Sequence, residues 1–175
     1  DDPELGHGTP SQKYAANVAA IRCLKQIESE GRLATPEEQN ILSQYVGWGG
    51  LSHWFDDRHP KYQELKDLLD TEEYNAARES SLTAFYTSPV IIQAMYQALE
   101  QMGFKEGNIL EPSCGVGNFL GMIPDSMAGS KTYGVELDSI SGRIAQQLYQ
   151  NSSIAVTGFE KVQMPDSFFD VAIGN

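Results

Sequence analysis

The sequence has few residues that could form disulfides or hold a metal ion. Two cysteines, Cys23 and Cys114, are too few for a disulfide framework, and the three histidines follow no metal-ligand spacing. No apolar run is long enough to cross a membrane, and no segment has the pattern of a secretory signal peptide. These absences predict a cytoplasmic protein without a structural metal.

Basic side chains are also scarce. The 175 residues carry 12 Lys and Arg against 24 Asp and Glu, which gives a formal net charge of −12. A surface that binds DNA phosphates is usually basic, because neutralising phosphates releases counterions. If DNA is a partner, we therefore expect it to be bound through parts of a longer chain that are not present here.

Both ends of the chain indicate a fragment of a longer protein. The sequence lacks an initiating Met, opens with the polar stretch "DDPELGHGTPSQ", and closes on "FFDVAIGN", whose apolar run predicts a strand. The length allows one ordinary domain with a small appendage, and an apolar content of 41% fits a globular core.

Residues 1–80 are predicted to form an all-helical N-terminal extension. Apolar residues recur at helical spacing between Tyr14 and Ile27, and "TPEEQ" carries a helix start with Thr35 as cap, Pro36 in the first turn and Glu38 reaching back. The acidic run "EEYNAARES" predicts a solvated helix face. We expect Trp48 and Trp54 to pack this extension onto the rest of the chain rather than to stack on bases.

Residues 81–175 are predicted to form an α/β domain with a parallel, Rossmann-like sheet. Ser88 and Pro89 start a helix that ends at Gly103, with an apolar stripe of Ile92, Met95, Leu99 and Met102. Four short strands are expected, at 108–110, 132–135, 154–156 and 169–173. Helices are expected to start near Gly117, between the first two strands, and at Ser139, between the second and third. Strands that alternate with helices are typical of a parallel sheet.

The turn after the first strand, "EPSCGVGNF", is the candidate ligand site. In such a sheet, ligands lie beyond the carboxyl ends of the strands. Gly115 and Gly117 would allow a close approach of the backbone, and Glu111 places an acid beside them. A second acid, Glu136, ends the next strand 25 residues later, where a carboxylate can accept both hydroxyls of a ribose.

Three ligands compete for this turn. A dinucleotide site would read G-x-G-x-x-G, but position 120 is Leu, and Glu111 would lie close to the pyrophosphate. A phosphate-binding P-loop would require Gly-Lys-Ser/Thr, which does not follow. S-adenosylmethionine has no phosphate and carries a sulfonium and an ammonium group, so the acids favour it. Alternatively, the glycines form only a tight turn, and Glu136 is a solvated strand end.

"EPSCGVGNF" resembles motif I of the amino-methyltransferases, D/E/N-P-x-x-G-x-G, and is most similar to that of adenine-N6 DNA methyltransferases. "FYTSP" resembles the aromatic-Thr-Pro stretch that precedes motif I, with Ser88 inserted between Thr87 and Pro89. The resemblance implies that Tyr86 and Thr87 line the methionine end of S-adenosyl-L-methionine and that Glu136 binds the ribose. It also implies a cofactor floor formed by the motif I residues Glu111, Pro112, Cys114, Gly115, Gly117 and Asn118.

The same resemblance implies roles for two later segments. After the third strand the family usually has an acid that binds the adenine amino group, and here either Phe159 or Glu160 stands at that position. The terminal "FDVAIGN" resembles the strand that leads into the catalytic motif N/D-P-P-aromatic, with Asn175 as its first residue. In that motif the amide oxygen orients the target amine toward the methyl group.

The helical front, "RLATPEEQNILSQYVGWGGL", together with these motifs resembles very large proteins of bacterial mobile elements that join a methyltransferase-like region to a helicase-like region. The implied activity is methylation of adenine N6 in DNA, with the fragment itself inactive. Two alternatives stay open at this point: a non-catalytic module of a helicase or mobilisation protein, and a methyltransferase that acts on protein or RNA amines.

Three further expectations concern single features. Cys114 has no His or basic partner nearby in the sequence, so we expect a packed small residue rather than a nucleophile. Asp138 is expected to cap the following helix rather than to bind a ligand. The last strand is expected to form an exposed sheet edge through which the fragment self-associates.

Overall fold

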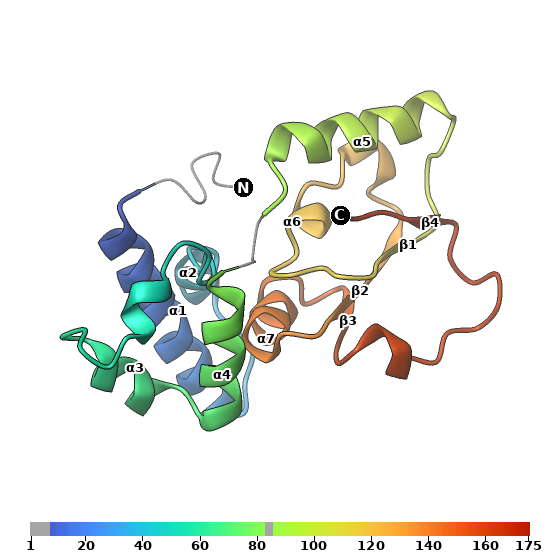
Figure 1. The fold of residues 1–175 in the computed structure, drawn as a ribbon. Coiled ribbons are helices and arrows are strands. Elements are labelled where there is room, and N and C mark those ends of the chain that lie inside the picture. The colour runs from blue at the N-terminus through green and yellow to red at the C-terminus, as the bar shows by residue number, and fades with distance from the viewer. Residues whose placement is uncertain (1–7, 83–85) are drawn as a thin grey trace. The chain divides into compact units, whose positions relative to one another are not determined.

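The computed structural model describes residues 8–82 and 86–175. They form two compact units, one ending at Tyr86 and the other running from Thr87 to Asn175 (Figure 1). Among these residues, no helix is both long enough and apolar enough to span a membrane.

The first unit is helical in its regular structure, as far as the structure describes it. Its elements are α1 (Pro10–Ser29), α2 (Pro36–Leu42), the 3-10 helix η1 (Ser52–Phe55), α3 (Tyr62–Leu68) and α4 (Thr71–Ser80). Three helices begin with a capping box, at Thr9, Thr35 and Asp70, in which the cap and the third helical residue bond each other's backbone N–H. The start predicted at Thr35, Pro36 and Glu38 is confirmed.

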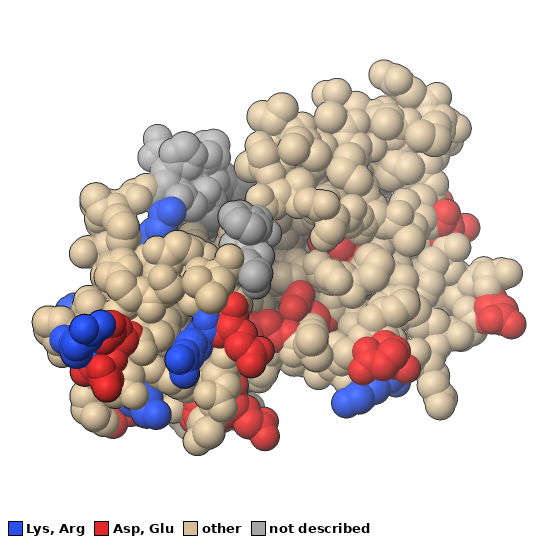
Figure 2. All heavy atoms as spheres, viewed as in Figure 1, with Lys and Arg blue, Asp and Glu red and all other residues tan. Residues whose placement is uncertain are grey.

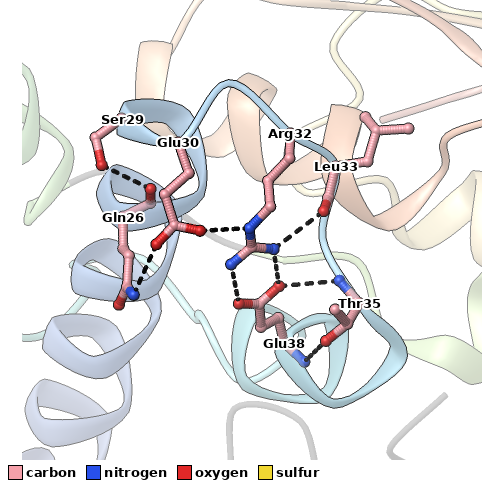
Figure 3. Close-up of polar contacts among 7 residues, drawn as sticks. All are labelled: Gln26, Ser29, Glu30, Arg32, Leu33, Thr35 and Glu38. Carbon is pink, nitrogen blue, oxygen red and sulfur yellow. Dashed lines mark hydrogen bonds and ion pairs between the residues drawn. The ribbon is translucent and has the colours of Figure 1, made fainter.

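A polar cluster around Arg32 connects the end of α1 to the start of α2 (Figure 3). The guanidinium binds both carboxylate oxygens of Glu38 at 2.7 Å, and its Nε donates to Glu30 at 2.5 Å. Glu38 also accepts from the backbone N–H of Thr35 at 2.9 Å. The pKa of Glu38 falls to about 2, mainly because of the hydrogen bonds from Arg32.

An aromatic cluster fills the core of the helical unit. Trp48 and Trp54 are both buried, and Tyr14 stacks on Trp54 with ring centroids 5.4 Å apart. Buried Asn17 holds the glycine-rich segment after α2, because its amide donates to Gly47 O at 2.5 Å and accepts from Val46 N at 2.9 Å. The two tryptophans therefore pack within their own unit.

The acidic run in α4 is only partly a solvated face. Glu73 is buried and binds Lys25 of α1 at 2.7 Å, while the same ammonium group donates to Leu68 O at 2.7 Å. Tyr74 and Ala77 are buried as well. The prediction of a wet helix face was wrong for these residues, because the helix turns this side toward α1 and α3.

The second unit contains a four-stranded parallel sheet, which confirms the predicted α/β fold class. Its strands are β1 (Asn108–Glu111), β2 (Lys131–Glu136), β3 (Ser153–Val156) and β4 (Val171–Ala172), in the order β3-β2-β1-β4. Glu111 pairs with Gly134, and Glu136 pairs with Val156, so the carboxyl ends of the first three strands lie together. Among the described residues, β4 lies at an edge of the sheet and pairs with β1 alone.

Five helical segments connect and cover these strands. They are α5 (Pro89–Gln101), α6 (Asn118–Gly121), η2 (Asp125–Met127), α7 (Ser139–Leu148) and η3 (Phe159–Lys161). One sheet face packs into an apolar core with α5 and α6, formed by Ile92, Tyr96, Ile109, Phe119, Met127 and Ile173. Asp138 caps α7 by accepting from Ser141 N at 2.9 Å, as predicted.

The start and the apolar stripe of α5 differ in detail from the prediction. Ser88 occupies the cap position but makes no side-chain cap bond. Tyr96 is buried in place of Met102, which is 77% exposed. Met102 follows the last helical residue and lies past the end of the packed stripe, whereas the hydroxyl of Tyr96 donates to Phe119 O at 2.6 Å within the core.

Candidate functional site

The loop between β1 and α6 is held against β2 by its own backbone. Cys114 N donates to Val135 O at 2.9 Å, and Gly117 N donates to Cys114 O at 2.8 Å. Gly115 and Gly117 have φ values of +56° and +93°, in the left-handed region that favours glycine. A Cβ on Gly117 would collide with the ring of Tyr149, so this position excludes other residues for two reasons.

Glu136 joins the tip of β2 to this loop. One carboxylate oxygen accepts the N–H of Gly115 at 2.6 Å, and the other accepts the N–H of Asp138 at 2.9 Å. The acid is therefore fixed beside the glycine turn, with each oxygen holding one donor and retaining acceptor capacity. Glu136 is half-buried, so part of its side chain remains accessible to solvent.

Glu111 lies beneath the same loop in a different environment. It is 3% exposed, and its Oε2 is buried without a hydrogen-bond partner. Burial, followed by the charge of Glu136, raises the pKa of Glu111 to about 9. The structure thus brings together the two acids that the sequence predicted, one ordered by backbone amides and the other buried and unpaired.

Cys114 and Tyr149 border the buried acid. Burial, followed by the charges of Glu111 and Glu136, raises the pKa of the Cys114 thiol to about 12. A thiol in this state stays protonated at neutral pH and is a poor nucleophile. Burial, then Glu111 and then Cys114, raise the pKa of Tyr149 to about 12. Cys114 is buried against Gly134, as a packed small residue would be.

Thr87 and Asn175 meet although 88 residues separate them. The side-chain amide of Asn175 donates to Thr87 Oγ1 at 3.1 Å. Asn175 follows the edge strand β4, and Thr87 immediately precedes the start of α5. The contact uses the NH₂ group of Asn175, which leaves the amide oxygen as the acceptor for another group.

The remaining predicted site residues lie at several places. Pro112 and Asn118 are half-buried at the two ends of the loop, and Phe159 and Glu160 are exposed in η3 after β3. Tyr86 ends the helical unit, and its hydroxyl lies against Gly47.

Two residues near the loop were not predicted from the sequence. Leu137 directly follows Glu136 and is 76% exposed, as an apolar side chain beside a ligand site would be before binding. Its signal was available, because it follows the strand-end acid. Tyr149 comes from the far end of α7, and only the tertiary fold shows that its ring packs on Gly117.

An apolar cavity of about 390 Å³ lies on a different part of the sheet. It is bordered by Leu110, Tyr133 and Val135 on the strands and by the segment 162–169, and none of the predicted site residues lines it. Within the described ranges, no cluster of three or more His, Cys, Asp or Glu side chains could hold a metal ion.

Charge is unevenly distributed between the units. Only four of the twelve basic residues of the chain fall within 87–175: Lys105, Lys131, Arg143 and Lys161. In the face drawn in Figure 2, the area of α5 is almost entirely without charge, whereas charges of both signs gather over the helical unit. No ion pair to Glu111 or Glu136 occurs within the part of the chain that the structure describes. The loop therefore offers no cation to a phosphate.

One curated protein shares sequence similarity with nearly the whole chain. Defense against restriction protein B of Escherichia phage P1 is 29% identical over 162 residues, a match that covers 91% of this chain. The chain spans only 6% of that relative. No protein-family model matches the chain.

Several solved methyltransferases show weak structural similarity. A putative class I S-adenosylmethionine-dependent methyltransferase from Listeria monocytogenes has a TM-score of 0.46 and 16% identity, covering 89% of this chain and 49% of its own. The plantazolicin methyltransferase BpumL, solved with S-adenosylhomocysteine, has a TM-score of 0.42 and 19% identity, covering 70% and 44%. Similarity at this level does not identify a ligand or a substrate.

Proposed function

We propose that the sheet unit binds S-adenosylmethionine and that the full-length protein transfers the methyl group to N6 of adenine in DNA. The observation that carries this proposal is the convergence of Glu111 and Glu136 on the Gly115–Gly117 turn, with Glu136 bonded to Gly115 N at 2.6 Å. The two carboxyl groups offer acceptors, and within the described residues no ion pair supplies them with a cation, which favours a cationic nucleoside over a ligand with a phosphate.

In this assignment each strand end holds one part of the ligand. The spare acceptor capacity of Glu136 takes the ribose hydroxyls, and Leu137 and Phe159, which are 76% and 50% exposed, are available to cover the adenine ring. The methionine part extends past the glycine turn. Glycine at this turn lets the ligand approach the backbone closely.

The reaction would take place beside Thr87 and Asn175. The amine nitrogen of the acceptor forms a bond to the methyl carbon as the C–S bond breaks, S-adenosylhomocysteine leaves, and the amine loses one proton to solvent. The amide oxygen of Asn175 would accept a hydrogen bond from that amine and orient its lone pair. Thr87, bonded to Asn175 at 3.1 Å, would hold the amide in place.

The phage relative suggests a biological use for such a reaction. Its name describes defense against restriction, and methylated adenine in a recognition sequence can protect DNA from a restriction enzyme. Because the chain spans 6% of that relative, DNA binding is assigned to other parts of the full-length protein. Labelled S-adenosylmethionine offered to the full-length protein with DNA, RNA or protein acceptors tests this, and incorporation into RNA or protein alone would overturn the choice of DNA.

Titration calorimetry tests the cofactor assignment. S-adenosylhomocysteine should bind one per chain, and NAD⁺ should not bind. Glu136→Ala should weaken S-adenosylhomocysteine binding by at least about tenfold, the usual effect of losing charge-assisted hydrogen bonds. Glu106→Ala is the matched control, since Glu106 precedes β1 at the opposite end of the strand.

Two results would contradict the assignment. Equal affinity of Glu136→Ala and the unmodified chain would remove the ribose role of Glu136. Binding of NAD⁺ without binding of S-adenosylhomocysteine would overturn the choice of cofactor.

A further inference from the structure

The buried carboxyl group of Glu111 lacks the partners that a buried acid normally has. Its side chain is 3% exposed, and Oε2 has no hydrogen-bond partner. An ionised carboxylate in such a place would be costly, because desolvation disfavours the charged form. The position therefore favours either a neutral acid or an acid that awaits a cation.

The groups that face Glu111 from the surrounding elements do not supply that partner. Glu136 on β2 is itself an acceptor, held by Gly115 N and Asp138 N. Tyr96 on α5 donates its hydroxyl hydrogen to Phe119 O at 2.6 Å. Cys114 in the loop directs its thiol to Gly115 O, 3.6 Å away.

Gly174, after β4, lies against the Glu111 side chain but carries no ionisable group. Another ionisable neighbour is Tyr149 at the end of α7, whose ring packs on Gly117. Its pKa is raised by burial and then by Glu111, as is the pKa of Tyr96, so both phenols are uncharged near neutral pH. The ionisable side chains around Glu111 are thus neutral or negative. A negative neighbour disfavours a negative charge on Glu111, and a neutral neighbour does not compensate for it.

We propose that Glu111 holds a proton in the empty protein and releases it when the ammonium group of S-adenosylmethionine binds beside it. This inference rests on the proposed function and adds a proton linkage to the same site. The ammonium supplies the positive charge and the N–H donors that the protein does not. One proton passes from the carboxyl group to solvent, and the ligand keeps its own.

The linkage has a defined sign. The pKa of Glu111 in the empty protein is raised to about 9, so the carboxyl is protonated at about pH 7, and a bound cation lowers that pKa. Binding therefore tightens as pH rises, by up to about tenfold per pH unit between about pH 6.5 and 8. The carboxylate of the ligand would instead keep the proton on Glu111, so release identifies the ammonium as the partner.

Calorimetry in two buffers of different ionisation enthalpy measures this proton directly. At about pH 7.5, S-adenosylhomocysteine, which carries the same ammonium, should release close to one proton per chain. 5′-Methylthioadenosine, which has the nucleoside and sulfur but no amino acid, should release none. Glu111→Gln keeps the shape of the side chain and should abolish both the proton release and the pH dependence.

The outcomes separate this inference from the proposed function. Binding of S-adenosylhomocysteine without proton release, or equal release with both ligands, overturns the role of Glu111 and leaves the cofactor assignment standing. No binding of S-adenosylhomocysteine overturns both. If Glu111→Gln does not fold, the comparison of the two ligands on the unmodified chain still decides the matter.

Discussion

The two acids beside the glycine turn have the same chemistry and opposite environments. Glu136 is bonded to two backbone N–H groups at 2.6 and 2.9 Å, whereas the buried oxygen of Glu111 has no donor. An acid that is already hydrogen-bonded can bind neutral hydroxyls without a change of protonation. An unpaired buried acid responds to charge. The difference assigns the ribose to Glu136 and the cation to Glu111 in our proposals.

Gly117 allows the clearest test at the scale of a single residue. Its φ of +93° is strained for any other residue, and a Cβ there would meet the ring of Tyr149. We expect Gly117→Ala to lower the free energy of unfolding of the sheet unit by about 2 kcal/mol or more. Binding of S-adenosylhomocysteine should weaken at least about tenfold. Hydrogen exchange of β1 and β2 and calorimetry measure the two effects.

Gly115→Ala is the matched control for this test. Gly115 also has a positive φ, of +56°, but a Cβ there would meet no atom within 4 Å. Gly115→Ala should lower the free energy of unfolding of the sheet unit by only about 1 kcal/mol. If the two substitutions change the hydrogen exchange of β1 and β2 equally, the contact of Gly117 with Tyr149 does not contribute to stability.

The residues of the site differ in how far the sequence could predict them. Gly115, Gly117 and Glu136 follow short-range rules, because a turn and a strand end are local features. The contact of Thr87 with Asn175 joins positions 88 residues apart and depends on where β4 enters the sheet. The packing of Tyr149 on Gly117 depends on the direction of α7 across the sheet, which no local pattern contains.

The connection between α1 and α2 gives a prediction at the scale of elements. Glu38 has a pKa of about 2 in the folded chain, below its ordinary value of about 4.3, chiefly because Arg32 donates to it. A lowered pKa contributes stability above about pH 4.3, and that stability is lost as pH falls toward about 2. Arg32→Gln should therefore lower the urea midpoint of the helical unit at neutral pH. The difference in urea midpoint between Arg32→Gln and the unmodified chain should shrink as the pH falls from about 4.5 to 2.5.

Tryptophan fluorescence can follow the urea unfolding of the helical unit specifically. Both tryptophans of the chain, Trp48 and Trp54, are buried in the helical unit, so their emission reports its unfolding. Arg22→Gln is the control, because Arg22 is 63% exposed in its side chain and makes a longer contact of 3.6 Å with Glu64. If the urea midpoint of Arg32→Gln differs from that of the unmodified chain by the same amount at low and at neutral pH, the ion pair with Glu38 does not have this role.

Helix starts were more predictable than helix faces. The capping residues Thr35 and Asp138 act within one turn, so the sequence indicates them directly. The buried face of α5 was misplaced at Met102, and the buried acid Glu73 in α4 was taken as solvated. Which side of a helix is covered depends on its neighbours, and Lys25 of α1, which binds Glu73, lies 48 residues before it in the sequence.

At the scale of the whole molecule, charge and an exposed sheet edge act in opposite directions. Within residues 8–82 and 86–175, β4 pairs with β1 alone, and Ala172 on this strand is exposed, so the edge can pair with a second copy. The net charge of −12 opposes that pairing. We expect association that grows with protein concentration and with salt, since salt screens the repulsion. Sedimentation velocity measures it.

Ala172→Lys tests whether association uses this edge. A charged side chain on an edge strand disfavours pairing between sheets, so the variant should stay monomeric under conditions in which the unmodified chain associates. Lys substitution at Ala94, an exposed position on α5, is the control for the added charge. A monomer at every concentration and salt level would remove the prediction.

Composition and net charge predict little about the binding partners of the protein. The shortage of basic residues predicts that DNA, if it is a partner, binds through other parts of a longer chain, and this stays a prediction. The acceptor could not be predicted in the same way. Its recognition depends on surfaces that the 175 residues do not identify by composition or spacing.

The most direct test of the account is the position of S-adenosylhomocysteine in a crystal of this chain. We predict that its ribose hydroxyls lie on Glu136, its ammonium group beside Glu111, and its backbone contacts at Gly115 and Gly117. Ligand density elsewhere on the chain, or a nucleotide phosphate seated on the glycine turn, would contradict the central claim that two acids and this turn form a site for a cationic nucleoside.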